Sequence, residues 1–417
     1  MRMKDYNYYS TLLVQNVGSK VRAIAPVIAS SAAFGYENAE EAEGIFKGEI
    51  TNPLYARMGN PTTARLEGIV AKMEGGLAAV ATSSGMGALA MVMTAYLRSD
   101  DEVLCIGGFF GGTYTLVNET MRRFGVKSSF CGIEDYEKIE TILQKGIHIV
   151  VIETVGNPSL ELPDLPKIIE LCNKYETLLV VDNTVTPLTL RPLEMGADIV
   201  IHSTTKAMSG HSAALGGIAV FRALKEQDKL KHNKYTHLHP IVNKMGKKAF
   251  VAIAKKRAMR DMGMSANANG SFLTMLGLET LALRIQRVND SLPKLVSMLD
   301  EKLPKHIKVS HPSLKSNTYH ERFNNDFNKA IGPIITLECG NKEIAFKLLN
   351  NLKVVTQTAN IGDNRTLALH MGSTIYRDFD KDTQKYLGVT DGLIRISVGL
   401  EDPSIIAEDF LQAVKSN

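Results

Sequence analysis

Two stretches decide the fold class, Leu178-Leu179-Val180-Val181-Asp182-Asn183-Thr184 and Ile199-Val200-Ile201-His202-Ser203-Thr204-Thr205-Lys206. Each begins with a run of Val, Ile and Leu that is continuous rather than alternating, which is typical of a strand buried on both faces of a sheet. A charged side chain, Asp182 or Lys206, ends or follows each run. Ligands of open α/β sheets bind outside the carboxyl ends of the strands, so we expect both side chains at one site.

Similar apolar runs recur along the first 260 residues and alternate with helical segments. The runs cover residues 77–82, 102–106, 148–153, 178–182, 198–202 and 216–221. One helix is expected from Pro61, which can start a helix, to the Gly75-Gly76 pair, which can stop it. A second helix is expected over residues 163–176. Strands that alternate with helices predict an α/β domain with a mostly parallel sheet.

The pattern changes beyond about residue 260, where we expect a smaller α+β domain. A long helix is predicted over residues 271–289, and isolated strand-like runs follow at 334–338 and 393–398. The chain has 417 residues, which is long for one core. We therefore expect an N-terminal arm over residues 1–60 that contacts a neighbouring subunit, a ligand-binding domain over 61–260 and a C-terminal domain over 261–417.

The composition is that of an ordinary globular protein and argues against several classes of partner. The net charge is +4 and 22% of residues are charged, so no nucleic acid is expected as a partner. No apolar run approaches the ~20 residues that span a bilayer, so no membrane is expected. The four cysteines form no CxxC pair, and the clustered His232, His237 and His239 lack further ligand-type neighbours. We expect free thiols, no metal and a cytoplasmic location.

Asp182 and Lys206 together indicate a particular cofactor chemistry. An acid that holds a pyridinium proton and a lysine that forms a Schiff base are the two groups that pyridoxal 5′-phosphate (PLP) requires. Ser203 and Thr205 lie close to the lysine in sequence and can donate hydroxyl groups to a phosphate. Taken one at a time, the two charged residues are also explained by a helix cap and a surface lysine.

A stretch of small residues, Thr82-Ser83-Ser84-Gly85-Met86-Gly87-Ala88-Leu89-Ala90, follows a strand-like run and opens a helix. Small residues there allow backbone N–H groups and the helix dipole to hold a phosphate. Gly85, Gly87 and Ala90 also match GxGxxA, the fingerprint of dinucleotide sites, so an NAD-dependent dehydrogenase is an alternative. That match lacks the acid about twenty residues later that would bind a ribose.

Two arginines are candidate anion-binding residues. Arg57, in Tyr55-Ala56-Arg57-Met58-Gly59, can pair with a phosphate or lie exposed on the arm. Arg395 lies among apolar residues in Leu393-Ile394-Arg395-Ile396-Ser397, and a buried guanidinium there needs a carboxylate partner. A substrate α-carboxylate is one candidate partner, and a structural Asp or Glu is the other.

Together these segments, from Pro26 to Pro403, resemble the Cys/Met-metabolism family of fold-type-I PLP-dependent enzymes. The resemblance implies that Lys206 is the catalytic residue that carries PLP and that Asp182 binds the pyridine nitrogen. It also implies the other site residues: Gly85, Met86, Ser203 and Thr205 at the phosphate, Tyr55 and Arg57 at the phosphate of a neighbouring subunit, Phe110 and Asn157 at the cofactor ring, and Glu153, Asn360 and Arg395 at the substrate.

Within the family, the chain is most similar to O-acetylhomoserine sulfhydrylases, at Arg260-Asp261-Met262-Gly263, at residues 277–284 and at Ala359-Asn360-Ile361-Gly362-Asp363. Methionine and cystathionine γ-lyases, the alternative, usually carry Ser-Leu-Gly at the last of these. The implied reaction replaces the γ-substituent of O-acetylhomoserine by sulfur, giving homocysteine or methionine. The sulfur donor stays open among sulfide, methanethiol, cysteine and a protein thiocarboxylate. A homotetramer built from dimers with shared active sites is also implied.

Two positions depart from the family pattern. Phe110 stands where relatives commonly have a Tyr that stacks on the PLP ring, so stacking is kept but a hydroxyl group is lost. Tyr376 stands where relatives carry a His after a Ser/Thr run. Whether Tyr114 or Tyr376 replaces a missing group depends on where their hydroxyl groups lie.

Overall fold

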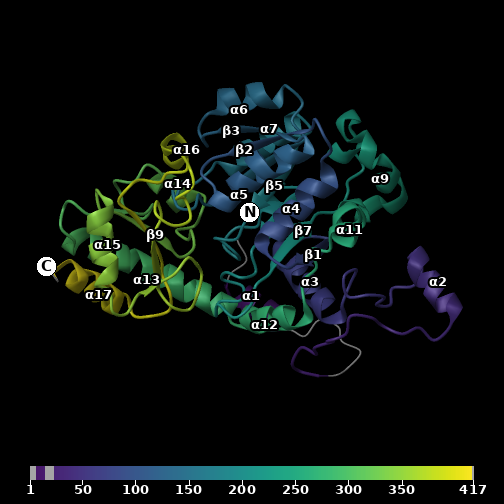
Figure 1. Cartoon of the computed structure of the whole chain (residues 1–417), viewed down its shortest axis with the longest axis horizontal. Helices are drawn as coiled ribbons and strands as arrows, with labels where there is room; N and C mark the ends of the chain where they lie inside the picture. Colours follow the sequence, from purple (N-terminus) through teal and green to yellow (C-terminus); the bar gives the residue numbers. More distant parts are fainter. Residues whose placement is uncertain (1–5, 15–22, 416–417) are drawn as a thin grey trace.

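The apolar runs form a seven-stranded sheet in the computed structural model, which describes residues 6–14 and 23–415 (Figure 1). Its strands in spatial order are β1 (Ala78–Thr82), β7 (Gly217–Phe221), β6 (Ile199–His202), β5 (Leu178–Asp182), β4 (Ile149–Glu153), β2 (Glu102–Ile106) and β3 (Lys127–Cys131). The strands from β6 to β3 are parallel, and β7 runs antiparallel to both of its neighbours. The prediction of a mostly parallel sheet is confirmed.

Helices cover both faces of this sheet, which explains the continuous apolar runs. In β5, Leu179 and Val181 pack in one cluster with α3 (Pro61–Glu74) and α7 (Leu165–Lys174). Leu178 and Val180 point the other way, toward α4 (Gly85–Tyr96) and α10 (Ala249–Ala254). Because side chains alternate along a strand, Asp182 continues on the α4 side. The remaining helices of this large lobe are α5 (Gly111–Thr115), α6 (Tyr136–Leu143), α8 (Pro192–Met195), α9 (His239–Met245) and α11 (Arg260–Met262).

Strand β3 was not among the predicted runs. Its sequence, Lys127-Ser128-Ser129-Phe130-Cys131, is mostly polar because it forms the edge of the sheet, and only Cys131 is buried. An edge strand needs no continuous apolar run, so the pattern used for the central strands could not detect it.

A second sheet forms the small lobe, as predicted. Its strands in order are β10 (Thr356–Gln357), β11 (Leu367–His370), β12 (Leu393–Ser397), β9 (Ile334–Glu338) and β8 (Lys308–Ser310). Apolar side chains of the sheet share a core with α13 (Leu281–Lys302), α15 (Lys342–Asn350) and α17 (Pro403–Lys415). Along the sequence, the short helices α14 (His320–Asn325) and α16 (Lys381–Tyr386) connect β8 to β9 and β11 to β12.

The single long helix predicted over residues 271–289 is wrong. Two helices occupy this region, α12 (Ala268–Glu279) and α13, and they meet at Thr280, whose φ of −108° and ψ of 2° are not helical. Arg284 stabilises the break, because its guanidinium donates to the carbonyl oxygen atoms of Gly277 and Ala207, both at 2.7 Å. The contact with Ala207, on the segment after Lys206, is a tertiary one that local periodicity cannot report.

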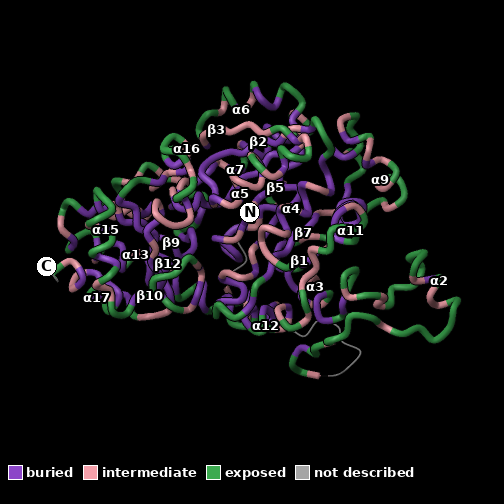
Figure 2. The backbone as a smooth tube through the Cα atoms, in the orientation of Figure 1, coloured by how far each residue is buried: buried purple, intermediate pink, exposed green. Residues whose placement is uncertain are grey.

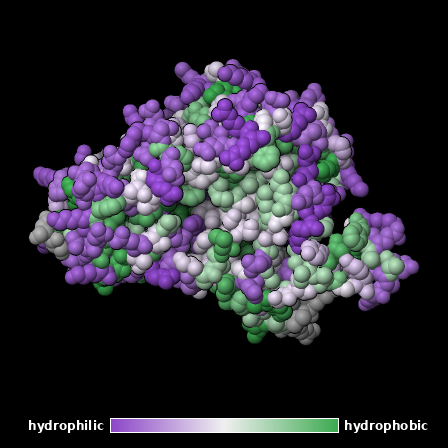
Figure 3. All heavy atoms as spheres, in the orientation of Figure 1, coloured by the Kyte–Doolittle hydropathy of each residue, from purple (hydrophilic) through white to green (hydrophobic). Residues whose placement is uncertain are grey.

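The N-terminal segment has two parts with different environments. Helix α1 (Tyr6–Val14) packs on α12 and α13 and buries Tyr9 and Leu13. Residues 23–60, which include α2 (Ala39–Lys47), are mostly exposed and project from the body (Figure 2). Hydrophobic side chains gather on this projection and over α12 on the face in Figure 3. Phe46, in α2, is 72% exposed. Within residues 6–14 and 23–415, no helix has the length and apolar character needed to cross a membrane.

Candidate active site

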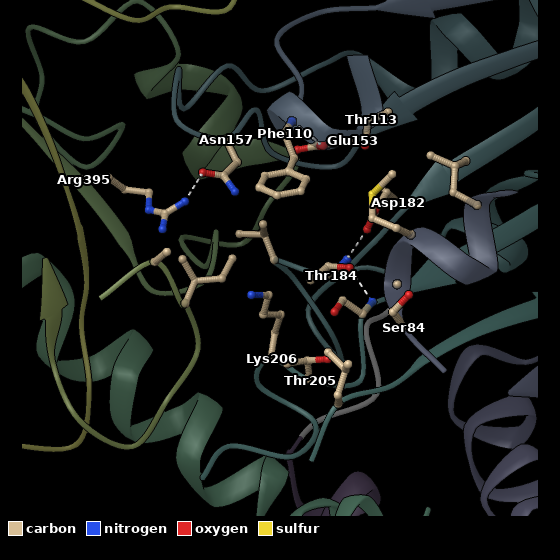
Figure 4. A pocket seen from close by; sticks show the side chains of 18 residues that line it. Ser84, Phe110, Thr113, Glu153, Asn157, Asp182, Thr184, Thr205, Lys206 and Arg395 are labelled. Atoms are coloured by element: carbon tan, nitrogen blue, oxygen red, sulfur yellow. Dashed lines mark hydrogen bonds between the residues drawn. The ribbon is translucent and has the colours of Figure 1, made fainter. Parts of the chain in front are cut away.

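A pocket lies where β4, β5 and β6 end, between the N-terminus of α4 and the small lobe (Figure 4). The empty space in it, including the open mouth, is about 880 Å³. The lining residues are Ser84, Gly85, Met86, Leu89, Phe110, Thr113, Glu153, Asn157, Asp182, Thr184, Val185, Ser203, Thr205, Lys206, Leu215, Ala359, Ile361 and Arg395. The structure therefore brings together ten of the thirteen residues named from the sequence, from both lobes.

The N-terminus of α4 forms one end of the pocket. Ser84 caps the helix, because its Oγ accepts from the backbone N–H of Gly87 at 3.0 Å. Gly85 passes so close to Ser203, the residue after β6, that a Cβ at Gly85 would lie 2.7 Å from the Cβ of Ser203, so only glycine fits. Backbone N–H groups at a helix N-terminus suit a phosphate, and Ser203 lies directly beside them.

Thr205 lines the same end, but its hydroxyl group already has partners. Its Oγ1 donates to the carbonyl oxygen of Gly216 at 3.1 Å and accepts from the N–H of Gly216 at 3.0 Å. A threonine hydroxyl has one proton to donate. Thr205 can therefore bind an anion only by turning away from Gly216, whereas the hydroxyl group of Ser203 can do so without that cost.

Asp182 points into the pocket from the end of β5. Its Oδ1 accepts from the N–H of Thr184 at 2.9 Å, and the Oγ1 of Thr184 accepts from the N–H of Ser203 at 2.8 Å. Burial raises the pKa of Asp182 above its ordinary value, although the hydrogen bonds from Thr184 oppose that rise. Thr184, which joins the ends of β5 and β6, was missed in the sequence; its position two residues after Asp182 is the only signal for it.

Lys206 extends into the middle of the pocket from the loop after β6. Burial and the nearby charge of Arg395 lower the pKa of its amine to about 8. The Nζ donates to the Oδ1 of Asn360 at 2.6 Å, so a small-lobe residue that does not itself line the pocket holds the lysine. An amine with this pKa is neutral in an appreciable fraction near pH 7, as covalent chemistry at a lysine requires.

Arg395 is a buried cation without a counter-ion among its bonded partners. Only 2% of it is exposed, and it donates to the Oδ1 of Asn157 at 3.0 Å and to the carbonyl oxygen of Asn360 at 3.3 Å, both neutral atoms. Burial lowers the pKa of Arg395 to about 10. Because arginine can only donate, the Oδ1 of Asn157 is engaged and its Nδ2 turns toward the pocket (Figure 4). The structural Asp or Glu considered for Arg395 is not its bonded partner, and a ligand carboxylate would suit it.

Glu153 and Phe110 form the wall opposite Lys206. The Oε1 of Glu153 accepts from the N–H of Phe110 at 2.8 Å and so orients that backbone. Burial, and next the charge of Asp182, raise the pKa of Glu153 well above its ordinary value. Tyr114 and Tyr376 are not among the lining residues: Tyr376 donates to the carbonyl oxygen of Asn157 at 2.8 Å, and Tyr114 stacks on Phe130. Neither tyrosine replaces the hydroxyl group that Phe110 lacks.

Tyr55 and Arg57 lie outside the pocket of their own chain. Tyr55 is 44% exposed, the guanidinium of Arg57 lies 5.5 Å from the centre of its ring, and Arg57 donates to the carbonyl oxygen of Arg260. Any contact between these side chains and a cofactor would involve the pocket of a second copy.

The residues present fit PLP. One pocket contains a lysine with a lowered pKa, an acid whose pKa is raised by burial, and a buried arginine without a charged bonded partner. It also contains a capped helix N-terminus at which only glycine fits. The dinucleotide alternative fails, because β2, the strand after α4, ends at Ile106 without an acid.

Comparisons with known proteins agree with this site. The sequence model of the family described as Cys/Met metabolism PLP-dependent enzyme matches residues 10–415. The chain is 32% identical over 399 residues to the homocysteine synthase of Schizosaccharomyces pombe, with 93% of each chain covered. It is also 32% identical over 397 residues to the L-methionine gamma-lyase of Fusobacterium nucleatum subsp. polymorphum, covering 94% of this chain and 93% of that one.

A solved structure from Campylobacter jejuni, named provisionally as an O-acetylhomoserine (thiol)-lyase, has a TM-score of 0.91 at 28% identity and covers 98% of this chain and 100% of its own. It contains N′-pyridoxyl-lysine-5′-monophosphate. The chain matches this structure, both relatives and the family model over nearly its whole length. It therefore belongs to the Cys/Met-metabolism family of PLP-dependent enzymes.

Proposed function

We propose that this enzyme replaces the acetate of O-acetylhomoserine by a sulfur nucleophile and forms homocysteine, or methionine from methanethiol. The observation that carries the proposal is the side chain of Phe110 at the pocket wall, with no tyrosine among the described lining residues. A thiolate that leaves from methionine or cystathionine benefits from a proton donor. Acetate leaves as a stable anion and needs less help, so a wall without a hydroxyl group favours an activated ester.

In the proposed mechanism the small-lobe end of the pocket binds the substrate and the large-lobe end binds the cofactor. Arg395 binds the α-carboxylate of the amino acid, and the Nζ of Lys206 takes the proton from Cα. PLP, when bound, supplies an electron sink that stabilises negative charge on the substrate carbons. Asp182 holds the proton on the pyridine nitrogen, while Gly85, Ser203 and the N-terminus of α4 bind the phosphate. Loss of a second proton, from Cβ, then allows acetate to leave Cγ. The sulfur nucleophile bonds to Cγ as its own proton is lost, and protons return to Cβ and Cα.

The alternative is a γ-lyase, which shares the first proton transfer but releases a keto acid and ammonia. The methionine γ-lyase relative is as similar to this chain as the homocysteine synthase, so similarity alone does not choose between the two reactions. The Asn360-Ile361-Gly362-Asp363 segment and Phe110 support replacement. For the sulfur donor, sulfide, methanethiol, cysteine and a protein thiocarboxylate stay under consideration.

A product assay tests the proposal directly. Purified enzyme with PLP receives O-acetylhomoserine with sulfide, O-acetylhomoserine alone, or methionine alone. We expect homocysteine only when both co-substrates are present. Rapid release of 2-ketobutyrate and methanethiol from methionine alone would reject replacement and establish the lyase.

We also propose a cytoplasmic homotetramer built from dimers, in which Tyr55 and Arg57 reach the cofactor phosphate of the neighbouring subunit. Two observations support this role. Tyr55 and Arg57 do not line the pocket of their own chain, and apolar side chains are exposed in the segment 23–60 and on α12. We retain the division into an arm over 1–60, a PLP-binding domain over 61–260 and a C-terminal domain over 261–417. The small-lobe strands all lie within the last of these ranges.

A further inference from the structure

A row of hydrogen bonds leads from the lysine out of the pocket and crosses between the lobes. The Nζ of Lys206 contacts the Oδ1 of Asn360 at 2.6 Å, and the Nδ2 of Asn360 contacts the Oγ of Ser212 at 2.9 Å. The Oγ of Ser212 contacts the Oδ2 of Asp363 at 2.5 Å. Ser212 belongs to the large-lobe segment after Lys206, whereas Asn360 and Asp363 belong to one small-lobe loop. A large-lobe hydroxyl group is therefore held between two small-lobe side chains.

The carboxylate of Asp363, at the end of the row farthest from Lys206, determines which group donates in each hydrogen bond. The side chain of Asp363 is fully buried, and burial alone would raise its pKa, but hydrogen bonds from Arg365 and Ser212 hold that pKa below its ordinary value. An ionised carboxylate can only accept, so Ser212 must donate to it. The lone pairs of Ser212 then accept from the Nδ2 of Asn360. The amide of Asn360 is thereby left with its oxygen, and not its nitrogen, facing Lys206.

We propose that Ser212 and Asp363 are positioning residues for the reaction, which act through Asn360 by holding its side-chain oxygen toward the amine of Lys206. An amide that could turn over would present an N–H group to an ammonium for part of the time, which is repulsive. With the oxygen held in place, the amine has a fixed acceptor whenever it is not bonded to the cofactor. The inference rests on the role of Lys206 and not on which γ-substituent leaves.

Other charged groups surround the amine, and one of them, Arg395, also contacts the row by donating to the backbone carbonyl oxygen of Asn360 at 3.3 Å. Glu153 from β4, Asp182 from β5 and Arg395 from β12 line the same pocket, and the hydroxyl group of Ser212 bonds to Asn360 and Asp363 rather than to any of the three. Of these, Arg395 acts on Lys206 through its charge. We therefore expect a substitution at Ser212 to change the titration of Lys206 through Asn360.

The test measures the titration of Lys206 itself in the full-length chain stripped of PLP. Acetic anhydride competes for Lys206 and a reference amine across a pH series, and mass spectrometry quantifies acetylated Lys206. The variants are Ser212→Ala and Ser212→Gly; the glycine variant tolerates the φ of 52° at this position and guards against misfolding of the first. We expect a wild-type midpoint near pH 8. Both variants should move it about one pH unit lower, because the protonated amine loses its fixed acceptor.

A change at Asn360 supplies the decisive control. In Asn360→Asp both side-chain oxygen atoms accept, so no orientation exists to be lost, and adding Ser212→Ala should leave the midpoint where Asn360→Asp alone puts it. Ser209→Ala, a nearby serine outside the row, should match the wild type. Two results would overturn the proposal. One is a wild-type midpoint in folded Ser212→Ala and Ser212→Gly. The other is a shift caused by Ser212→Ala that is as large in the Asn360→Asp background as in the wild type. The assay uses no substrate, so its outcome is independent of the product assay for γ-replacement.

Discussion

The two ends of the pocket are built in opposite ways. At the large-lobe end, several polar groups already have partners within the chain: Asp182 with Thr184, Thr184 with the backbone of Ser203, and Ser84 with the N-terminus of α4. At the small-lobe end, Arg395 is buried with only neutral oxygen atoms as partners. The first arrangement suits a cofactor that stays, since hydrogen bonds within the chain already orient these groups. The second suits an anion that comes and goes, since a buried cation without a counter-ion gains most when one arrives.

Removing the lysine between the two ends should have the largest effect. We expect Lys206→Ala to lower product formation by at least about 10³-fold, because both the covalent link and the proton acceptor are lost. Borohydride reduction and peptide mapping should place PLP on Lys206 of the wild type. Lys234 is the matched control: its pKa is also lowered to about 8, but its amine donates to the carbonyl oxygen atoms of Ile147 and Tyr175. PLP on Lys234, or turnover by Lys206→Ala, would contradict the assignment.

Arg395→Ala separates the two ends. We expect the KM for the amino acid to rise by about 10²- to 10³-fold while bound PLP stays constant, because a desolvated charge partner of the substrate is lost. Arg395→Lys should recover only part of the affinity, since lysine keeps the charge but not the planar fork. Steady-state kinetics and absorbance of bound cofactor check this. If the variant loses PLP yet binds the amino acid normally, Arg395 has a structural role and does not bind the substrate.

Arg57→Ala tests whether the cofactor end is completed by a second subunit. We expect PLP to bind about tenfold more weakly, because a charged contact to phosphate is lost. Mixing Arg57→Ala subunits with Lys206→Ala subunits should restore activity, since hybrid dimers contain one pocket with both groups intact. Absence of recovery after confirmed subunit exchange would argue that each pocket is complete within one chain.

The pH dependence of PLP attachment links the two ends. Lys206 reacts as the neutral amine, so coupling to PLP should accelerate as the pH rises toward about 8, the pKa of that lysine. The charge of Arg395 contributes to this lowered pKa, so Arg395→Ala should raise it and move the midpoint to higher pH. Coupling at pH 7 should then be slower than in the wild type. A midpoint that stays in place would show that burial alone accounts for the lowered pKa.

Phe110→Tyr should have the smallest effect. The restored hydroxyl group gives the pocket wall a proton donor, so we expect elimination from methionine to rise by a few-fold, with little change in replacement on O-acetylhomoserine. Keto acid release from methionine is the measurement. If it does not rise, the leaving-group argument fails even where the product assay supports replacement.

The sequence by itself determined the parts of this protein in which local pattern and function coincide. Continuous apolar runs predicted six of the strands in the large sheet, because a strand buried on both faces has no room for polar residues. Asp182 and Lys206 could be paired across 23 intervening residues because parallel strands put their carboxyl ends on one edge. The cofactor end of the pocket was predictable for that reason.

Only the tertiary structure decided the features that depend on contacts between distant segments. The edge strand β3 has no apolar pattern, and the break at Thr280 is stabilised by Arg284 bonded to the carbonyl of Ala207. Side chains that meet across the two lobes determine the orientation of Asn360 and the neutral partners of Arg395. Thr184 connects the ends of two neighbouring strands. Periodicity reports which face of an element is buried, but a hydrogen bond depends on which atoms face each other after the elements have packed.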